Sequence, residues 1–216
     1  MNKFILQRNE LLFQKVAANL EKRGFKVYCC KDKEEANKLL LDKIPKDKIV
    51  SWGGSVTIDE LGIKKILKDA NYKTIDRDTA KNEAEREEFI LKSITSDIFL
   101  MSTNAISEDG ELVNIDKIGN RLAALCYGAK NVYVIIGVNK IAKTLDEAIS
   151  RARNIAAPIN AQRISSIYKM NTPCTVSGSC SNCKSEDSIC SNILITRLSY
   201  PKNRISVILV NEELGF

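Results

Sequence analysis

Four of the seven cysteines in the chain lie close together in one polar segment, residues 172–191. They are Cys174, Cys180, Cys183 and Cys190. The middle two have the CxxC spacing that lets a pair of thiolates reach one metal atom, and the glycine, serine and asparagine residues around them allow the chain to wrap. Four thiolates suit tetrahedral zinc or a [4Fe-4S] cluster, because both accept soft sulfur ligands. The segment therefore predicts a metal centre held by these four side chains.

The spacing of the four cysteines does not choose between the two metals. Five, two and six residues separate successive cysteines, and these gaps fit no stock pattern for either zinc or an iron–sulfur cluster. Zinc would explain the segment as a staple that orders a loop, whereas a cluster would explain it as an electron port. A reversible dithiol pair and plain surface thiols are the remaining alternatives.

The absence of histidine from the chain limits the chemistry further. A Ser–His or Cys–His nucleophile is excluded, and so is any metal site that needs imidazole. The three cysteines outside the segment, Cys29, Cys30 and Cys126, fall in an expected strand and an expected helix. We predict that they pack there as small hydrophobic side chains.

A second candidate for chemistry is the stretch SWGGSVTIDELG, residues 51–62, where a strand is expected to give way to a helix. Gly53 and Gly54 would let the backbone approach a ligand, while Ser55 and Thr57 would supply hydroxyl donors at the positive end of the helix. The stretch therefore predicts an anion cradle, with a tight turn capped by serine or threonine as the alternative. It is neither a Walker loop nor a dinucleotide fingerprint, because the lysine and the third glycine of those motifs are not in place.

Polar side chains also crowd the stretch STNAISEDGELVNIDKIGNR, residues 102–121, just after an expected core strand. Because ligands bind at the carboxyl ends of strands in open α/β sheets, we expect these groups to line a pocket. Glu108 and Asp116 are the candidate catalytic carboxylates. The other polar candidates are Asn104, Asp109, Glu111, Asn114, Asn120 and Arg121. Asn139 and Lys140 follow the next expected strand in an equivalent position. The alternatives are that EDGE is a hairpin turn and that many of these side chains cap turns.

The elements that must position these groups alternate between helix and strand. A helical pattern of apolar residues runs from Phe4 to Leu20 and ends near Gly24. Further helices are expected at 34–44, 56–70, 80–95 and 121–128, and strands at 25–30, 48–52, 73–76, 97–102, 131–137, 192–198 and 204–216. The alternation predicts an α/β fold, with a mostly parallel sheet covered by helices on both faces. We expect one domain over residues 1–216.

The composition argues against several classes of protein. Thirty-three basic and 27 acidic residues give a net charge of +6, but the lysines are scattered among acids rather than gathered on one stripe, so we expect no nucleic-acid partner. No apolar stretch has the length of a membrane span or the form of a signal peptide. We therefore expect a cytoplasmic protein, whose thiols stay reduced and serve metal binding or redox chemistry rather than disulfides.

Five stretches of the chain together resemble one known family. They are WGGSVTIDELGI, STNAISEDGELVNIDKIGNRLAAL, VIIGVNKI, EAISRARNIAAPINAQRI and the segment from Pro173 to Cys190, in this order. On these stretches the chain is similar to the stand-alone lactate-utilisation (LUD) domain family. The resemblance covers nearly all of the chain beyond residue 48. It implies a fold related to ribose-5-phosphate isomerase, glucosamine-6-phosphate deaminase and the CoA transferases, with the ligand site at strand carboxyl ends. A stretch similar to GELVNIDKIGN closes the active site in some related isomerases, which implies ligand roles for Asn114, Asp116, Gly119 and Asn120.

The resemblance also implies a part in the oxidation of lactate to pyruvate, beside iron–sulfur redox partner proteins, but it supplies no catalytic residue. It favours an iron–sulfur cluster of the [4Fe-4S] type over zinc, although shorter relatives lack the cysteine segment. Three functions stay open. The first is a subunit of a lactate-oxidising system with a small anionic ligand. The second is a sugar-phosphate isomerase or CoA-transferase-like enzyme, in which Glu108 or Asp116 performs proton transfer or acyl chemistry and zinc is structural. The third is a non-catalytic assembly module. The oligomeric state is open too, a homo-oligomer included.

Overall fold

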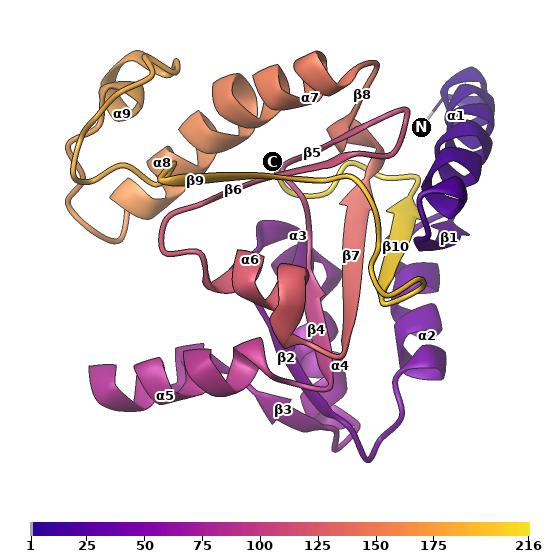
Figure 1. The fold of residues 1–216 in the computed structure, drawn as a ribbon, viewed down its shortest axis with the longest axis horizontal. Coiled ribbons are helices and arrows are strands. Elements are labelled where there is room, and N and C mark those ends of the chain that lie inside the picture. The colour runs from indigo at the N-terminus through magenta and orange to yellow at the C-terminus, as the bar shows by residue number, and fades with distance from the viewer. Residues whose placement is uncertain (1) are drawn as a thin grey trace.

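Six parallel strands form the central sheet of the computed structural model, which describes residues 2–216 (Figure 1). In spatial order they are β1 (Lys26–Cys30), β10 (Ile205–Val210), β7 (Asn131–Gly137), β4 (Ile98–Met101), β2 (Ile49–Trp52) and β3 (Lys73–Ile75). The inner strands β10 and β4 are buried along their whole length. Such continuous apolar runs are typical of parallel strands covered on both faces. The predicted α/β fold with a parallel sheet is therefore confirmed.

Helices cover both faces of this sheet. The elements α2 (Lys33–Lys43), α3 (Val56–Leu61) and α4 (Ile63–Asp69) pack on one face, and α1 (Lys3–Lys22), α5 (Glu83–Ile94), α6 (Asn120–Ala123) and the π-helical turn η2 (Ala124–Gly128) lie on the other. Strand β4 illustrates the division, since Leu100 joins the core with α2 to α4 while Phe99 joins the core with α1. The helix expected at 56–70 is two helices, because Gly62 adopts a left-handed conformation with φ of 69° and ends the first.

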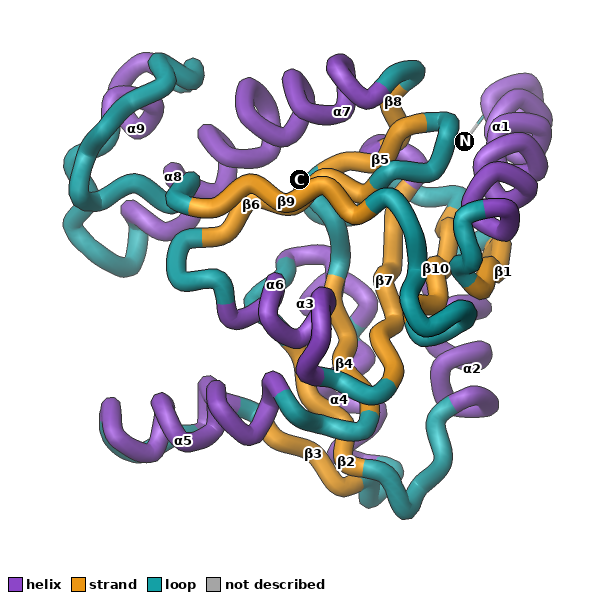
Figure 2. Tube along the Cα trace, in the orientation of Figure 1, coloured by secondary structure: helices purple, strands orange, loops and turns teal. Residues whose placement is uncertain are grey.

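A second sheet of four strands, which the sequence did not predict, crosses the carboxyl end of the first (Figure 2). Its order is β8 (Ile141–Ala142), β5 (Ala105–Ser107), β6 (Leu112–Asp116) and β9 (Asn192–Thr196). The strands β5 and β6 form the antiparallel hairpin expected at EDGE, and Gly110 in the turn has φ of 95°. One face of this sheet packs on the main core through Ile106 and Leu112. The helices α7 (Leu145–Arg151), η4 (Ala152–Ala156) and α8 (Ala157–Ser165) pack on the other face.

The remaining elements are short. The one-turn helices η1 (Arg77–Thr79) and η3 (Val138–Lys140) follow β3 and β7, and α9 (Pro173–Ser177) opens the cysteine segment. Of the three cysteines expected to pack in the core, Cys30 is buried, but Cys29 and Cys126 are exposed. That prediction was wrong for Cys29 and Cys126. On the edge strand β1, Cys30 joins the core with α2, whereas Cys29 points to the opposite face of the sheet and is exposed. Within residues 2–216, no helix combines the length and apolar character that a membrane span requires.

The order of the main strands creates a crevice at one place. The chain leaves β2 towards β3, on one side, and leaves β4 towards β7, on the opposite side. Adjacent parallel strands whose connections diverge in this way leave an opening at their carboxyl ends, where ligands bind in open α/β sheets. Trp52, the only tryptophan of the chain, ends β2 at this point and is buried on the α3 and α4 side.

Candidate functional site

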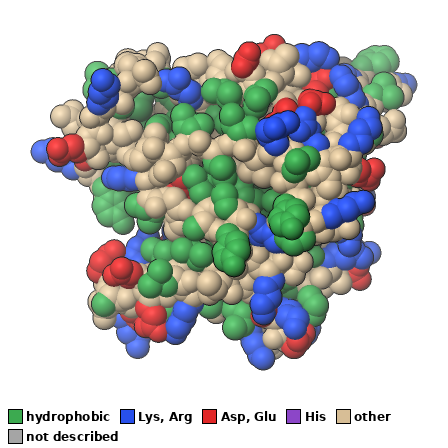
Figure 3. Space-filling model, in the orientation of Figure 1, with side chains coloured by type: hydrophobic (Ala, Val, Ile, Leu, Met, Phe, Trp, Pro, Cys, Tyr) green, Lys and Arg blue, Asp and Glu red, His purple; other side chains and the backbone are tan. Residues whose placement is uncertain are grey.

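A cleft of about 400 Å³ lies at the carboxyl ends of β2 and β4. Its walls come from the loops after these strands, from η1, from the turn between β6 and α6, and from the chain beyond α8. Seven basic and two acidic side chains line it: Arg77, Arg86, Lys117, Arg121, Lys140, Arg163 and Lys169 against Asp116 and Asp187. In Figure 3 the molecule is indented between α5 below and the α8 region above, with basic side chains visible beside the indentation. A cleft with this surplus of positive charge attracts anions.

Two arginines lie directly over the glycine turn after β2. A Cβ atom on Gly53 would stand 2.5 Å from Cγ of Arg121, and one on Gly54 would stand 2.7 Å from Nη2 of Arg77. No real Cβ contact is that short. Gly53 therefore leaves room for the stem of Arg121, whereas at Gly54 an added Cβ would displace only the end of the Arg77 side chain.

Arg77 presents a guanidinium that makes a long ion pair but no hydrogen bond within residues 2–216. The carboxylate of Asp78 lies 3.8 Å from Nε of Arg77. Burial lowers the pKa of Arg77 and the charges of Arg86 and Arg121 lower it further, whereas the carboxylates of Asp78 and Asp116 oppose this effect. Three guanidiniums that repel one another at the edge of a cleft would be stabilised by an anion bound between them.

Arg121 is held in place by a buried carboxylate. Its Nε donates to Oδ2 of Asp116 at 2.7 Å, and its Nη2 donates to the carbonyl of Ile115 at 2.6 Å. Asp116 also accepts from the backbone N–H of Gly119 at 2.9 Å, and Gly119 turns the chain with φ of 84°. The oxygens of Asp116 are thus occupied in fixing Arg121 and the turn that leads into α6.

Lys140 forms the floor of the cleft and is only 3% exposed. Its Nζ donates to Oγ1 of Thr57 at 2.8 Å and to Oγ of Ser102 at 3.0 Å. A third bond, to the carbonyl of Thr103, measures 3.2 Å. The lysine therefore ties together the loops after β2 and β4 and the end of β7. Burial, with a smaller effect from Arg151, lowers its pKa to about 7. The three acceptors favour the ammonium form, and with this pKa we expect Lys140 to be mostly charged below neutral pH.

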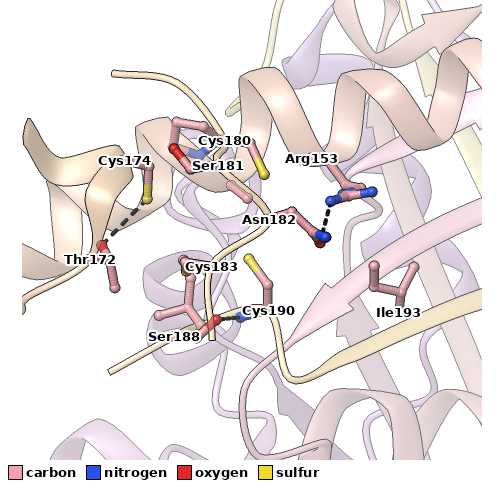
Figure 4. A pocket seen from close by; sticks show the side chains of 13 residues that line it. Arg153, Thr172, Cys174, Cys180, Ser181, Asn182, Cys183, Ser188, Cys190 and Ile193 are labelled. Atoms are coloured by element: carbon pink, nitrogen blue, oxygen red, sulfur yellow. Dashed lines mark hydrogen bonds between the residues drawn. The ribbon is translucent and has the colours of Figure 1, made fainter. Parts of the chain in front are cut away.

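The four cysteines of the segment line one cavity of about 150 Å³ (Figure 4). Figure 4 shows their side chains arranged around a shared space, beside α8 and the start of β9. Within the described residues, no three cysteine or acidic side chains stand close enough to ligate a metal ion as they are placed.

The environment of Cys190 favours its neutral thiol. Burial raises the pKa of its thiol to about 11, and the neighbouring Cys180, Cys174 and Cys183 raise it as well. A thiolate among other thiolates is strongly disfavoured here unless a cation balances the charge. Four soft donors around one cavity match the ligand set that zinc or an iron–sulfur cluster takes.

Comparison with known proteins identifies the family. The family model described as the LUD domain matches residues 13–210. The chain belongs to the LUD domain family. The resemblance inferred from the sequence motifs is thereby confirmed, and membership associates the chain with lactate utilisation. Among solved structures, a DUF162 family protein from Deinococcus radiodurans is similar in fold, with a TM-score of 0.53 and 10% sequence identity, over 94% of this chain and 98% of that one. No match is found among curated proteins.

Most of the residues that the sequence singled out meet at the cleft of this LUD domain. Those that line it are Gly54, Ser55, Thr57, Asn104, Asp116, Asn120, Arg121 and Lys140. Gly53 lies beneath Arg121, and Gly119 lies in the turn before α6. Ser55 caps α3, since its Oγ accepts from the N–H of Ile58 at 3.4 Å, so the capping alternative holds for this residue.

Five of the predicted polar candidates lie elsewhere in the LUD domain: Glu108, Asp109, Glu111, Asn114 and Asn139. Asp109 and Glu111 pair with Arg23, outside the cleft. Glu108 is in the β5–β6 turn, outside the cleft, where Lys15 and then Lys143 pair with it and lower its pKa. Asn114 is fully buried between the sheets, and neither polar atom of its side chain has a hydrogen-bond partner within residues 2–216. Asn139 holds the end of the described chain, because its Oδ1 accepts from Leu214 at 3.1 Å.

The sequence reasoning missed the basic side chains that come from other parts of the chain. Arg77 follows β3, so the rule that ligand groups follow parallel strands could have found it. Arg86 lies on α5, and Arg163 and Lys169 come from α8 and the chain after it. No motif marks Arg86 or Lys169, and although Arg163 lies in the stretch EAISRARNIAAPINAQRI, nothing there assigned it to the cleft. All three reach the cleft only through the packing of distant elements.

Proposed function

We propose that this LUD-domain protein takes part in the oxidation of lactate to pyruvate and that the basic cleft binds the small organic acid through its carboxylate. The observation that carries the proposal is the guanidinium of Arg77, which lines a cleft with seven basic and two acidic side chains and donates no hydrogen bond within the described part of the chain. Membership of the LUD domain family links the chain to lactate utilisation.

The cleft residues have separate roles in this proposal. Arg77 offers the free donors, and a guanidinium matches a carboxylate with two parallel hydrogen bonds. Arg121 adds a second positive charge in an orientation fixed by Asp116. Lys140 supplies positive charge at the floor of the cleft and holds the loops after β2 and β4 in place through hydrogen bonds to Thr57 and Ser102. Binding of the acid relieves the repulsion among the basic groups, which favours anionic over neutral ligands.

The four cysteines of the segment would hold the metal centre. Iron–sulfur of the [4Fe-4S] type is favoured over zinc, because the role is oxidative. Such a cluster supplies one-electron transfer when bound, whereas zinc would only order the segment. Electrons would pass to iron–sulfur partner proteins. A cytoplasmic location suits the proposal, because thiols stay reduced there.

Anaerobic purification followed by metal analysis and ligand binding tests the proposal. The protein should carry iron and sulfide at about four of each per chain, the composition of a [4Fe-4S] cluster. It should bind L-lactate or pyruvate in a calorimetric titration and reduce an artificial electron acceptor in the presence of lactate. Detection of one zinc ion and no iron per chain would instead indicate that the four cysteines form a structural zinc site. No binding of either acid would refute the proposed ligand.

A second candidate function rests on the place of Asp116 in the cleft. A sugar-phosphate isomerase or CoA-transferase-like enzyme could use this carboxylate for proton transfer or acyl chemistry, with zinc at the cysteines. Turnover of a phosphorylated sugar or an acyl-CoA, lost in Asp116→Asn with metal content unchanged, would favour this candidate. If the protein binds none of these compounds, a non-catalytic assembly role takes its place.

A further inference from the structure

The basic cleft and the cysteine cavity share a wall. Ile189 lines both of them. Its neighbours in the sequence are divided between the two sites. Asp187 lines the cleft, whereas Ser188 and Cys190 line the cysteine cavity. The cysteine segment is therefore part of the ligand cleft as well as the expected metal site.

Successive turns of helix α8 line the same two sites. Its first residues, Ala157 and Pro158, line the cysteine cavity. The next turns, with Asn160, Arg163 and Ile164, line the cleft. The two sites thus lie on opposite sides of one layer, which is formed by α8 and by residues 187–190.

Hydrogen bonds with Arg153, Gln162 and Asn171 join the cysteine segment to the rest of the chain. The one regular element of the segment is α9, of five residues. Oδ2 of Asp187 accepts from the N–H of Asn171 at 2.8 Å, and Oγ of Ser185 donates to the Asn171 carbonyl at the same distance. These bonds also fix residues 168–170, which line the cleft just before Asn171. The position of the segment therefore sets the position of this wall of the cleft.

We propose that metal binding by the four cysteines strengthens anion binding in the basic cleft, through the shared wall of Asp187 and Ile189. Four thiolates on one centre close the short loops between the cysteines and remove most of the freedom of the segment. The wall is then ordered before the anion arrives, so the anion binds without the cost of ordering it. By linkage, the anion strengthens metal binding by the same factor. The inference rests on the proposed function, because it requires both sites.

One electrostatic effect opposes this coupling. Four thiolates with one divalent ion carry a charge of about −2, which repels an anion. Salt at about 0.15 M screens this repulsion over roughly 8 Å in the solvent-filled parts of the two sites. The ordered wall lines the anion site itself, whereas the charge acts only across the wall. Ordering therefore prevails at this ionic strength.

Calorimetric titration of the reduced, anaerobic protein with sulfate tests the coupling. Sulfate serves as the anion and Zn²⁺ as the metal, because both are redox-inert and remain soluble together. The dissociation constant for sulfate should fall about fivefold or more when the protein holds equimolar Zn²⁺, and Zn²⁺ should bind more tightly by the same factor in saturating sulfate. An unchanged or weaker affinity for sulfate overturns the inference.

Three variants locate the effect. Cys180→Ser/Cys183→Ser should abolish the effect of Zn²⁺ on sulfate binding, whereas Cys29→Ser/Cys126→Ser, which removes two exposed thiols outside the segment, should keep it. Ile189→Ala should still bind Zn²⁺ but show less than about twofold coupling. Coupling of the original size in Ile189→Ala overturns the role of the wall. If Zn²⁺ or sulfate alone fails to bind, the inference falls, whereas the proposed function is decided separately by the titration with L-lactate or pyruvate and by the iron content. If both bind independently, only the inference falls.

Discussion

Replacement of Arg77 by methionine tests the central role given to this residue. The variant Arg77→Met removes the guanidinium and keeps an apolar side chain over Gly54. In the folded protein the guanidinium donates no hydrogen bond within residues 2–216, and Asp78 is 3.8 Å from Nε. The change therefore leaves no buried acceptor unsatisfied. Because burial and the charges of Arg86 and Arg121 disfavour the Arg77 cation, the free energy of unfolding should stay the same or rise.

The loss should appear in ligand binding instead. A hydrogen bond to a charged group contributes about 1.5–3 kcal/mol, so the loss of one should weaken binding of a carboxylate roughly tenfold to a hundredfold. Arg77→Lys should have an intermediate affinity, because it keeps the charge and loses the planar fork. Calorimetric titration with pyruvate measures the binding, and thermal denaturation measures stability in the same samples.

Arg197→Met is the matched control for this measurement. Arg197 is exposed, follows β9 and does not line the cleft, so its replacement lowers the net charge equally without touching the site. It should change the affinity by less than about twofold, and only at low salt. Equal affinity of Arg77→Met and the parent protein for pyruvate would refute the reasoning, and so would equal losses in the two variants.

Three further outcomes are expected. Gly54→Ala should displace the end of Arg77, whose Nη2 is 2.7 Å from the added Cβ, so pyruvate affinity should fall by up to about tenfold while the melting temperature hardly changes; an unchanged affinity would contradict the packing described. Lys140→Met should remove a pH dependence of stability. The unfolded lysine has its ordinary pKa of 10.5 and the folded one about 7, so the unfolded chain binds more protons between these values and the free energy of unfolding of the parent rises across that range. Denaturation at pH 6 to 10 measures the difference, and equal slopes would refute the assignment. Glu108→Gln should leave pyruvate affinity unchanged, because Glu108 pairs with Lys15 outside the cleft; a tenfold loss would restore the catalytic role predicted from the sequence.

The sequence predicted the main sheet because each parallel strand is an apolar run followed by polar residues. The second sheet escaped prediction because β5 and β8 have only three and two residues, too few for a pattern of alternation. The break at Gly62 was missed because the apolar periodicity continues across it into α4.

The candidate site was predicted in part for a related reason. Residues 102–121 were treated as one polar group, but the hairpin reverses the chain within them. The backbone N–H of Ile115 donates to Oδ1 of Asn104 at 2.8 Å, which places the two open ends of the hairpin together at the cleft. Glu108 lies at the closed end, a full strand away. A polar stretch in sequence thus shows that a site exists near a strand end, but the direction of the chain decides which of its members take part.

The place of Trp52 gives this protein a built-in optical signal. It is the only indole in the chain, it precedes the glycine turn directly, and the ammonium groups of Lys64 and Lys68 lie 5.9 and 5.8 Å from its ring centre. Fluorescence excited at the long-wavelength edge of the protein absorption therefore comes from Trp52, at the end of β2. Ligand binding in the neighbouring crevice can be followed by the emission wavelength and intensity of Trp52 fluorescence, without attaching a dye.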